Sequence, residues 1–381
     1  MINPLVVLGA TGSIGTQTLE VADHLGIEVV AVAARGTSPS LAGIAARYPD
    51  AAVVASGGSS DERSSFLSDT GGRARFGDEA LIDLARMPGT TVVNGIVGAA
   101  GLRATVAALE AGNRVALANK ESLVAGGPVV KQALADSSGE LVPVDSEHSA
   151  LYQCLIGEPP DSVARLVLTA SGGPFRGRTV ESLQTVTPQE ALAHPTWDMG
   201  PRITVDSATL FNKGLEVIEA HFLFDVPYDN IDVVVHPQSI LHSAVAFSDG
   251  SWKGHFGHPD MRIPIQFALT LPDRATGLAA PFDLAGLDLS FEKPDRETFP
   301  ALDLCFDAGR RGGSSPAVLN AADEIAVDAF LQGRLGFTGI SDVVARTLET
   351  VSHRELRSVE DVIAVDSEAR ETATGLIAGT C

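Results

Sequence analysis

The glycine-rich turn at residues 9–15 constrains the fold more than any other feature of this chain. It reads Gly-Ala-Thr-Gly-Ser-Ile-Gly and directly follows an apolar run at residues 5–8. Glycine permits the tight turn and lets backbone N–H groups approach a pyrophosphate at the positive end of a helix. The spacing is a variant of the dinucleotide-binding fingerprint, so it predicts a strand, a turn and a helix that bind a dinucleotide. A structural glycine turn without a ligand is the alternative.

Short apolar runs alternate with amphipathic stretches through the first part of the chain. The runs are predicted strands at residues 5–8, 28–33, 52–54, 91–94, 114–118 and 141–144. Nearly continuous apolar strands between helices are typical of a parallel sheet that is covered on both faces. We therefore predict an α/β protein with an N-terminal Rossmann-like parallel-sheet domain at residues 1–145.

The pattern changes after residue 145. Strand candidates at residues 165–170, 231–236 and 243–247 are mixed with helices, which predicts a central α+β catalytic domain at residues 146–274. Within it, residues 171–201 form a long segment of weak periodicity, and segments of this length are often lids. A proline-containing linker at 275–300 and a C-terminal helical domain at 301–381, with helices at 317–331 and 340–351, complete the predicted domains.

Charge and cysteine content exclude several classes of function. The formal net charge of -21 disfavours nucleic acid and anionic membranes as partners, and any bound phosphate needs a local cluster of donors. Three scattered cysteines without CxxC spacing form neither a disulfide framework nor a thiolate metal site. The chain has no signal-peptide pattern and no apolar run of about 20 residues. We expect a soluble, cytoplasmic protein.

The residues after the second predicted strand bear on the choice between NAD and NADP. An acidic residue there binds the ribose 2′-hydroxyl, whereas an arginine accommodates a 2′-phosphate. The chain has Arg35, Gly36 and Thr37 at this place and no acid. The sequence therefore favours NADPH, and the alternative is that Arg35 is an ordinary surface charge.

Three carboxylates form a candidate metal site. Asp145 and Glu147 are two residues apart at a predicted strand end, where alternate side chains point to the same side. Glu216 lies four residues after Asn212 on a predicted helix, so these two share a face. Carboxylates with water and substrate oxygens suit Mg²⁺ or Mn²⁺ better than zinc. The alternative is that all three are ordinary surface acids.

Polar side chains near these acids could bind a phosphate. Ser171, Ser207, Asn212 and Lys213 provide neutral and cationic donors, which supply the local positive site that the acidic chain otherwise lacks. His194 and Trp197 lie in the long segment, and together they are typical of a lid that closes over a ligand. Separately, a histidine and an aromatic residue in a loop more often have structural roles.

Nine sequence blocks, in this order, resemble the 1-deoxy-D-xylulose 5-phosphate reductoisomerase family and span nearly the whole chain. They are GATGSIG at 9–15, LANKESLV at 117–124, VDSEHSA at 144–150, ASGGPF at 170–175, HPTWDMG at 194–200, VDSATLFNKGLEVIE at 205–219, HPQS at 236–239, PDMRIPI at 259–265 and LNAADEIAVDAFL at 319–331. The resemblance implies rearrangement of 1-deoxy-D-xylulose 5-phosphate to a branched aldehyde phosphate, which NADPH reduces to 2-C-methyl-D-erythritol 4-phosphate. It also implies a role in isoprenoid precursor synthesis, a phosphorylated keto-sugar substrate, and a homodimer.

The resemblance also implies a role for each matching residue. Asp145, Glu147 and Glu216 become metal ligands, and Ser171, His194, Ser207, Asn212 and Lys213 hold the phosphate. Lys120 and Ser146 orient the substrate, Trp197 covers its apolar side and Met199 closes the lid. The cofactor contacts are Thr11, Gly12, Ser13, Ile14, Asn119, Glu121 and Gly200, with Met261 near the same groove.

The chain departs from the family pattern at one place that matters. Family members commonly have a glycine, then lysine, arginine or glycine, then asparagine after the second strand, where this chain has Arg35, Gly36 and Thr37. The segment SWKGHFGH at residues 251–258 is also less typical of the family.

Other functions remain as alternatives. An aspartate-semialdehyde dehydrogenase shares the GATG turn but needs a catalytic cysteine, and Cys154 lies in no acyl-enzyme motif. A reductoisomerase-like enzyme with a rearranged lid domain would lack the lid blocks that this chain retains. A non-catalytic NADP-binding regulator would be expected to lose the carboxylates or Lys213, which are present.

Overall fold

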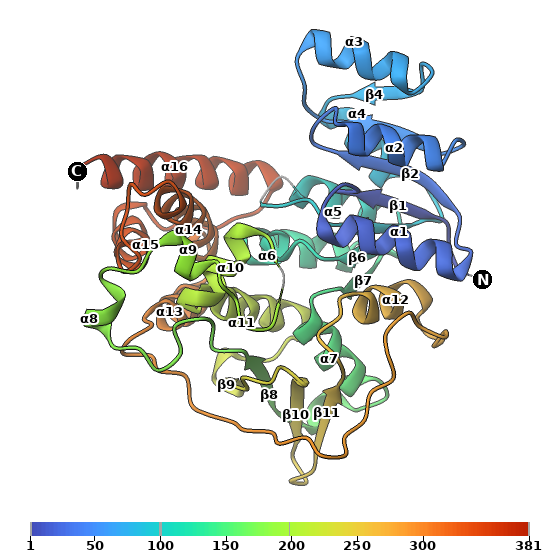
Figure 1. The fold of residues 1–381 in the computed structure, drawn as a ribbon. Helices are drawn as coiled ribbons and strands as arrows, with labels where there is room; N and C mark the ends of the chain where they lie inside the picture. The colour runs from blue at the N-terminus through green and yellow to red at the C-terminus, as the bar shows by residue number, and fades with distance from the viewer. Residues whose placement is uncertain (1, 99–100, 198, 380–381) are drawn as a thin grey trace. The chain divides into compact units, whose positions relative to one another are not determined.

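The structure is a computed structural model that describes residues 2–98, 101–197 and 199–379. The chain forms two compact units (Figure 1). The first consists of residues 1–122, 129–149 and 260–280, and the second of residues 123–128, 150–259 and 281–381. Among the described residues, no helix has the length and hydrophobicity that crossing a bilayer requires.

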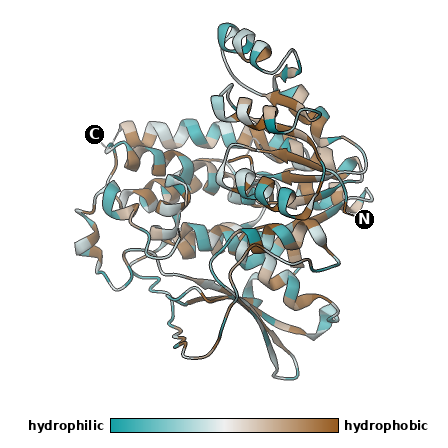
Figure 2. Ribbon diagram, turned by 45° about the vertical axis from the view of Figure 1, so that its right-hand side comes forward, coloured by the Kyte–Doolittle hydropathy of each residue, from teal (hydrophilic) through white to brown (hydrophobic). Residues whose placement is uncertain are grey.

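The first unit is built around a seven-stranded sheet with the strand order β4-β3-β2-β1-β5-β6-β7. Every neighbouring pair in this sheet is parallel. Figure 2 shows its strands as predominantly hydrophobic. The strands are β1 (Leu5–Leu8), β2 (Val29–Ala34), β3 (Ala52–Ala55), β4 (Ala74–Phe76), β5 (Thr91–Asn94), β6 (Arg114–Leu117) and β7 (Glu140–Pro143). The prediction of an α/β fold with an N-terminal Rossmann-like sheet is confirmed.

Helices connect these strands. They are α1 (Ser13–Leu25), α2 (Pro39–Arg47), α3 (Ser60–Asp69), α4 (Asp78–Ala85), α5 (Gly101–Glu110) and α6 (Lys120–Ala135), and α7 (Ser146–Leu155) follows the last strand, β7. The strand order reverses between β1 and β5. In open α/β sheets, ligands bind outside the carboxyl ends of the strands at such a switch point. The glycine turn follows β1 at this point.

The second unit contains a four-stranded mixed sheet with the order β11-β10-β8-β9. Its strands are β8 (Val163–Ala170), β9 (Ile231–Val235), β10 (Leu241–Phe247) and β11 (Trp252–Phe256). The 3-10 helices η1 (Pro160–Ser162) and η2 (Tyr228–Asn230) precede β8 and β9. The other helices are α8 (Val180–Leu183), α9 (Pro188–Ala191), α10 (Pro201–Thr209), α11 (Phe211–Phe224), α13 (Ala301–Arg311), α14 (Ser315–Leu331), α15 (Gly339–Thr350) and α16 (Val359–Ala378).

The compact units differ from the predicted domain boundaries, most extensively at two places. Residues 260–280, with helix α12 (Arg262–Thr270), join the first unit because α12 packs against α1, β6 and β7. Residues 301–379 share one hydrophobic core with the central segment: Phe175 packs on Phe337, and Gly214 abuts Cys305. The C-terminal helices therefore complete the second unit.

Candidate active site

The glycine turn has the geometry of a phosphate-binding loop. Gly9 has a φ of +85°, and a Cβ there would lie 2.6 Å from the carbonyl oxygen of Gly95. A Cβ on Gly15 would lie 2.3 Å from the carbonyl oxygen of Gly9, so the helix packs directly on the turn. Gly12 is the N-cap of α1, which has no side-chain cap hydrogen bond and no acid in its first turn. The positive helix end therefore suits an anion.

The residues of the turn follow β1 and run into α1. Ile14 contacts Gly95, which directly follows β5, because a Cβ on Gly95 would lie 3.5 Å from the Ile14 Cβ. Thr11 is partly buried, whereas Gly12 and Ser13 are exposed. The backbone of this turn is therefore open to a ligand.

Arg35, Gly36 and Thr37 lie at the end of β2, and Arg35 and Gly36 are exposed. The carbonyl oxygen of Arg35 accepts a hydrogen bond from the N–H of Gly57 (2.6 Å), so this residue is anchored to the loop after β3. Gly58 has a φ of +97°, and a Cβ there would lie 3.2 Å from the Thr37 methyl group. The Arg35 side chain is thus carried on a fixed backbone at the sheet edge where a dinucleotide ribose lies in this fold.

Asn119 organises the loop after β6. It is 2% exposed, and its Nδ2 donates hydrogen bonds to the Gly98 carbonyl oxygen (2.9 Å) and to Glu121 Oε2 (2.6 Å). Its Oδ1 accepts the N–H of Ser122 (3.1 Å) as the N-cap of α6. Asn119 and Glu121 are therefore fixed side chains at the carboxyl edge of the sheet.

The segment after β7 gathers the predicted metal ligands of the first unit. The Nζ of Lys120 lies 3.2 Å from Asp145 Oδ2, and the N–H of Glu147 donates to Asp145 Oδ1 (3.3 Å). Ser146 Oγ donates to Glu147 Oε2 (2.6 Å). Asp145 and Glu147 do not lie on a strand, contrary to the prediction. The strand ends at Pro143 and Glu147 lies in the first turn of α7, so strand alternation does not orient these two side chains.

His148 is a residue that the sequence reasoning missed. It is fully buried, and its Nδ1 lies 3.3 Å from Asp145 Oδ1. A histidine that holds a candidate metal-binding carboxylate is a common supporting arrangement in metal sites. Its place in the block DSEH, three residues after Asp145 at helical spacing, was the available signal.

His194 and Ser171 form a pair in the second unit. His194 Nδ1 accepts hydrogen bonds from the N–H groups of Thr196 (3.2 Å) and Trp197 (2.9 Å). The proton of the neutral ring therefore lies on Nε2, which donates to Ser171 Oγ at 3.0 Å. Burial lowers the pKa of His194, which favours this neutral form. The N–H of Gly173 also donates to Ser171 Oγ (3.2 Å).

The junction of α10 and α11 carries the other predicted phosphate donors. Leu210 joins the two helices with a φ of +69°. Ser207 belongs to the last turns of α10, and a Cβ on Gly173 would lie 2.8 Å from its carbonyl oxygen. The loop that bears Ser171 therefore packs tightly on Ser207.

Glu216 is held by its own helix, as the predicted spacing requires. Its Oε1 accepts a hydrogen bond from Asn212 Nδ2 (2.6 Å), and its Oε2 accepts one from Lys213 Nζ. Lys213 is 4% exposed and Glu216 is 1% exposed. A buried carboxylate and a buried ammonium compensate each other, whereas either one alone would be costly to bury.

His242 on β10 is a second residue that the sequence reasoning missed. It is 5% exposed, and its ring centroid lies 6.3 Å from that of Trp197. Burial, with His255 and Lys213 nearby, lowers the pKa of His242 to about 4, so its ring is neutral at pH 7. No motif marks a single histidine on an apolar strand. Only the fold shows that it lies beside Trp197 and Lys213.

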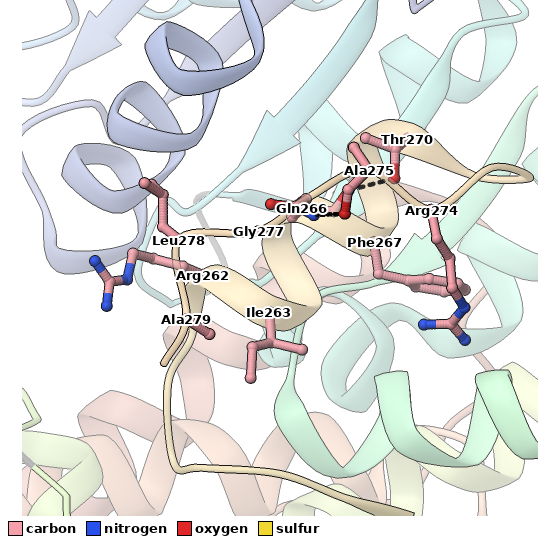
Figure 3. A pocket seen from close by; sticks show the side chains of 10 residues that line it. All are labelled: Arg262, Ile263, Gln266, Phe267, Thr270, Arg274, Ala275, Gly277, Leu278 and Ala279. Atoms are coloured by element: carbon pink, nitrogen blue, oxygen red, sulfur yellow. Dashed lines mark hydrogen bonds between the residues drawn. The ribbon is translucent and has the colours of Figure 1, made fainter. Parts of the chain in front are cut away.

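A separate cavity of about 250 Å³ lies along α12 in the first unit (Figure 3). Its two cations are already engaged. Arg262 forms a two-pronged pair with Asp260 (2.7 and 2.9 Å), and the Arg274 guanidinium lies over the Phe267 ring at 5.4 Å. None of the predicted site residues lines this cavity, although Met261 adjoins Arg262. It is therefore not the predicted active site.

The fold and these side chains define a class of protein. A Rossmann-like sheet with a phosphate-binding glycine turn is joined to a second unit with buried cationic and carboxylate groups. Such an arrangement is typical of nucleotide-dependent enzymes that act on an anionic substrate.

Comparison with known proteins gives the family. The family model of 1-deoxy-D-xylulose 5-phosphate reductoisomerase matches residues 5–127. Models of the C-terminal domains of these enzymes match residues 141–224 and 256–372. The chain belongs to the 1-deoxy-D-xylulose 5-phosphate reductoisomerase family.

Relatives of that name match the chain over its full length. The protein from Ralstonia nicotianae is 48% identical, with 99% of this chain and 98% of the relative covered. The protein from Nocardia farcinica is 50% identical, with 98% and 94% covered.

Solved structures agree in fold. The reductoisomerase from Zymomonas mobilis in complex with NADPH has a TM-score of 0.92 and 42% identity, with 99% of both chains covered. A DOX-P reductoisomerase in complex with NADPH, fosmidomycin and magnesium has a TM-score of 0.91 and 37% identity, with 99% of this chain and 98% of the other covered. The prediction of this family and of an enzyme is confirmed.

Proposed function

We propose that this chain converts 1-deoxy-D-xylulose 5-phosphate to 2-C-methyl-D-erythritol 4-phosphate with NADPH and Mg²⁺ or Mn²⁺, in isoprenoid precursor synthesis. The main support comes from α11, where the buried carboxylate of Glu216 accepts hydrogen bonds from Asn212 and Lys213. One helix turn thus holds both a metal-binding group and phosphate-binding groups. Family membership over the full chain length supports the same reaction.

The glycine turn of the first unit is suited to binding NADPH. The turn at Gly9, Gly12 and Gly15 has no room for side chains at two of its three glycines, and α1 has no side-chain cap. Thr11, Gly12, Ser13 and Ile14 would hold the pyrophosphate, and Arg35, Gly36 and Thr37 the 2′-phosphate. Asn119, Glu121 and, from the second unit, Gly200 would contact the cofactor further along. When bound, NADPH supplies the hydride that reduces the aldehyde.

The donor set fits a hard divalent cation. Asp145, Glu147 and Glu216 offer carboxylate oxygens, which Mg²⁺ and Mn²⁺ prefer. We propose that these three share one cation. When bound, it acts as a Lewis acid and a template for the ketone and hydroxyl oxygens of the substrate. Lys120 compensates the charge of Asp145, and His148 orients the same carboxylate.

The phosphate-binding residues come from the second unit. Ser171, His194, Ser207, Asn212 and Lys213 together offer hydroxyl, imidazole, amide and ammonium donors. Lys213 supplies the positive charge, and the buried surroundings strengthen its attraction for a phosphate. In binding the phosphate, Asn212 and Lys213 would turn from the oxygens of Glu216, which frees those oxygens for the cation. Phosphate and cation binding are thus coupled through one carboxylate.

The remaining side chains position the substrate and exclude water. Lys120 and Ser146 would orient its hydroxyl groups, while Trp197 covers its apolar side and Met199 closes the segment. His242 packs beside Trp197 with a neutral ring, so it supports the cover without adding a charge. Removing water around the reacting carbons strengthens every electrostatic contact there.

Turnover tests the proposal directly. The purified chain should oxidise NADPH only when 1-deoxy-D-xylulose 5-phosphate and Mg²⁺ or Mn²⁺ are all present. A chelator should abolish the activity, and added Mn²⁺ should restore it. The phosphonate fosmidomycin should inhibit in competition with the substrate. Absence of turnover under these conditions would disprove the proposed reaction.

We also propose a homodimer formed through β11. This strand lies at the edge of the second sheet, and Trp252 and Phe256 on it are 61% and 41% exposed. An edge strand with exposed aromatic side chains suits pairing with a second copy. Sedimentation analysis of Trp252→Glu, beside an exposed control Glu349→Gln, tests this surface.

A cytoplasmic location is proposed as well, since the buried thiols of Cys154 and Cys305 are free.

A further inference from the structure

A buried ionic cluster joins helices α10 and α14 in the second unit, and the proposed chemistry does not use it. Asp206 is 4% exposed and Asp323 is 0% exposed. Arg202 reaches both carboxyl groups, with its Nε 3.5 Å from Asp206 Oδ2 and its Nη2 3.6 Å from Asp323 Oδ2. Two buried acids therefore face one guanidinium.

Further charged groups near the pair form ion pairs with one another. Glu324 on α14 lies 3.0 Å from Arg202 and 2.6 Å from Arg370. Arg370 on α16 also pairs with Asp366 at 2.6 Å. The nearby Cys305 thiol on α13 is neutral, because burial and the two aspartates raise its pKa.

The charges of the two arginines and four acids named here do not balance if every acid is ionised. Arg202 and Arg370 face four carboxyl groups, those of Asp206, Asp323, Glu324 and Asp366. An unbalanced buried carboxylate is costly, and two close carboxyl groups reduce this cost by sharing one proton. Burial and the Asp206 carboxylate raise the pKa of Asp323 well above its usual range, against the opposing effect of Arg202. Among the described residues, neither carboxyl oxygen of Asp323 has a hydrogen-bond partner, which is costly for an ionised buried carboxylate.

Asp206 is the residue before Ser207, a proposed phosphate ligand. Neighbouring residues on a helix point about 100° apart, so α10 can fix Asp206 against α14 while Ser207 remains partly exposed. The carbonyl oxygen of Ser207 abuts Gly173, two residues from Ser171. A shift of α10 would therefore move both phosphate-binding serines.

We propose that Asp206 and Asp323 share one proton and that this pair, held by Arg202, positions α10 so that Ser207 and Ser171 can bind the substrate phosphate. The role of the two serines rests on the proposed function. Asp206, Asp323 and Arg202 are positioning residues, since they act through α10. The shared proton itself does not depend on the reaction.

Infrared spectroscopy tests the shared proton. The wild-type protein at pH 7 should show the C=O stretching band of a buried protonated carboxyl group. Both Asp323→Asn and Asp206→Asn should lose this band, because an amide then donates the hydrogen bond that the proton made. The exposed control Glu371→Gln should retain it. If the wild type lacks the band, or if both asparagine variants retain it, the shared proton is excluded.

Steady-state kinetics of the holoenzyme, with NADPH and Mg²⁺, tests the positioning role. Each single asparagine variant keeps one anion and one donor at the pair, so its KM for the substrate should stay within about twofold of the wild type. The double variant leaves Arg202 without either carboxylate, and its KM should rise about tenfold with little change in kcat. An unchanged KM in the double variant would overturn the positioning role.

A second variant covers the case in which the double variant does not fold. Arg202→Lys keeps the positive charge but loses the planar fork that reaches both acids. Its KM should rise several-fold while kcat and the Kd for NADPH stay near wild-type values. Equal losses in kcat and NADPH affinity would instead indicate general destabilisation and overturn the proposal. Wild-type turnover is measured first. Its absence would disprove the proposed function, while the infrared result would still decide the shared proton.

Discussion

His194 donates a hydrogen bond from Nε2 to Ser171 Oγ across 3.0 Å, and its Nδ1 accepts the N–H groups of Thr196 and Trp197. One neutral ring therefore links a proposed phosphate ligand to the backbone of the proposed lid. The ring can do this only in its neutral Nε2–H form, because a protonated ring has no acceptor.

The first prediction concerns the protonation of His194. Burial lowers its pKa, so its midpoint in an NMR titration should fall below the ordinary histidine value of about 6.5. The stabilisation provided by the neutral ring is then present above about pH 6.5 and lost as the pH falls through the lowered pKa. A midpoint above 6.5 would contradict this reading of the site.

The second prediction distinguishes the contributions that the two ring nitrogen atoms of His194 make to substrate binding. In His194→Gln the side-chain amide can still donate to Ser171, so the KM for the phosphorylated substrate should rise less than about threefold. His194→Ala removes both contacts and should raise that KM about tenfold, which corresponds to the loss of roughly one or two hydrogen bonds. The Kd for NADPH, measured by fluorescence, should not change in either variant. If alanine and glutamine behave alike, the hydrogen bond to Ser171 has no role in binding.

The third prediction concerns Glu216. Glu216→Gln keeps the shape of the side chain but weakens cation binding and leaves Lys213 without its carboxylate. Turnover should fall by more than about 100-fold, while the Kd for NADPH stays near the wild-type value. Exposed Glu349→Gln is a matched control on α15 that should leave both quantities unchanged. A loss of NADPH affinity in Glu216→Gln would refute its assignment as a metal ligand.

The fourth prediction concerns cofactor choice. Arg35 is exposed at the end of β2, and its backbone is anchored to Gly57. Arg35→Ala should raise the Kd for NADPH about tenfold, the value of one charge-assisted contact to a phosphate, and leave the Kd for NADH unchanged. Exposed Arg86→Ala removes the same charge elsewhere in the first unit and serves as the control. Equal effects on the two cofactors would show that Arg35 does not contact the 2′-phosphate.

The sequence predicted those parts of the fold that depend on local patterns. The strands at residues 5–8 and 91–94 are found with the predicted bounds because they are short buried apolar runs between turns. Strand β4 (Ala74–Phe76) was missed because it has three residues, too few to show a period. Strand β11 was missed because its side chains are largely exposed, so its pattern is not that of a buried strand.

The candidate site was predictable to the extent that its residues lie close in sequence. Asn212 and Glu216 hydrogen-bond as their spacing requires, whereas His242 comes from a distant strand that carries no motif. Asp206 and Asp323 are more than 100 residues apart in the chain, and only the packing of α10 on α14 brings them together. Long-range burial of polar groups is set by tertiary packing, which local periodicity does not encode.

The last prediction tests the glycine turn through two alanine substitutions that should change the free energy of unfolding in opposite directions. A Cβ on Gly15 would lie 2.3 Å from the carbonyl oxygen of Gly9, so Gly15→Ala must displace the turn. It should lower the free energy of unfolding by about 1–3 kcal/mol, the usual range for overpacking, and weaken NADPH binding. Gly43 lies within α2 and has nothing within 4 Å of its Cβ position. Gly43→Ala should therefore raise the free energy of unfolding by about 0.5–1 kcal/mol. Urea denaturation of both variants gives these values, and a Gly15→Ala protein as stable as Gly43→Ala would show that the helix does not pack on the turn.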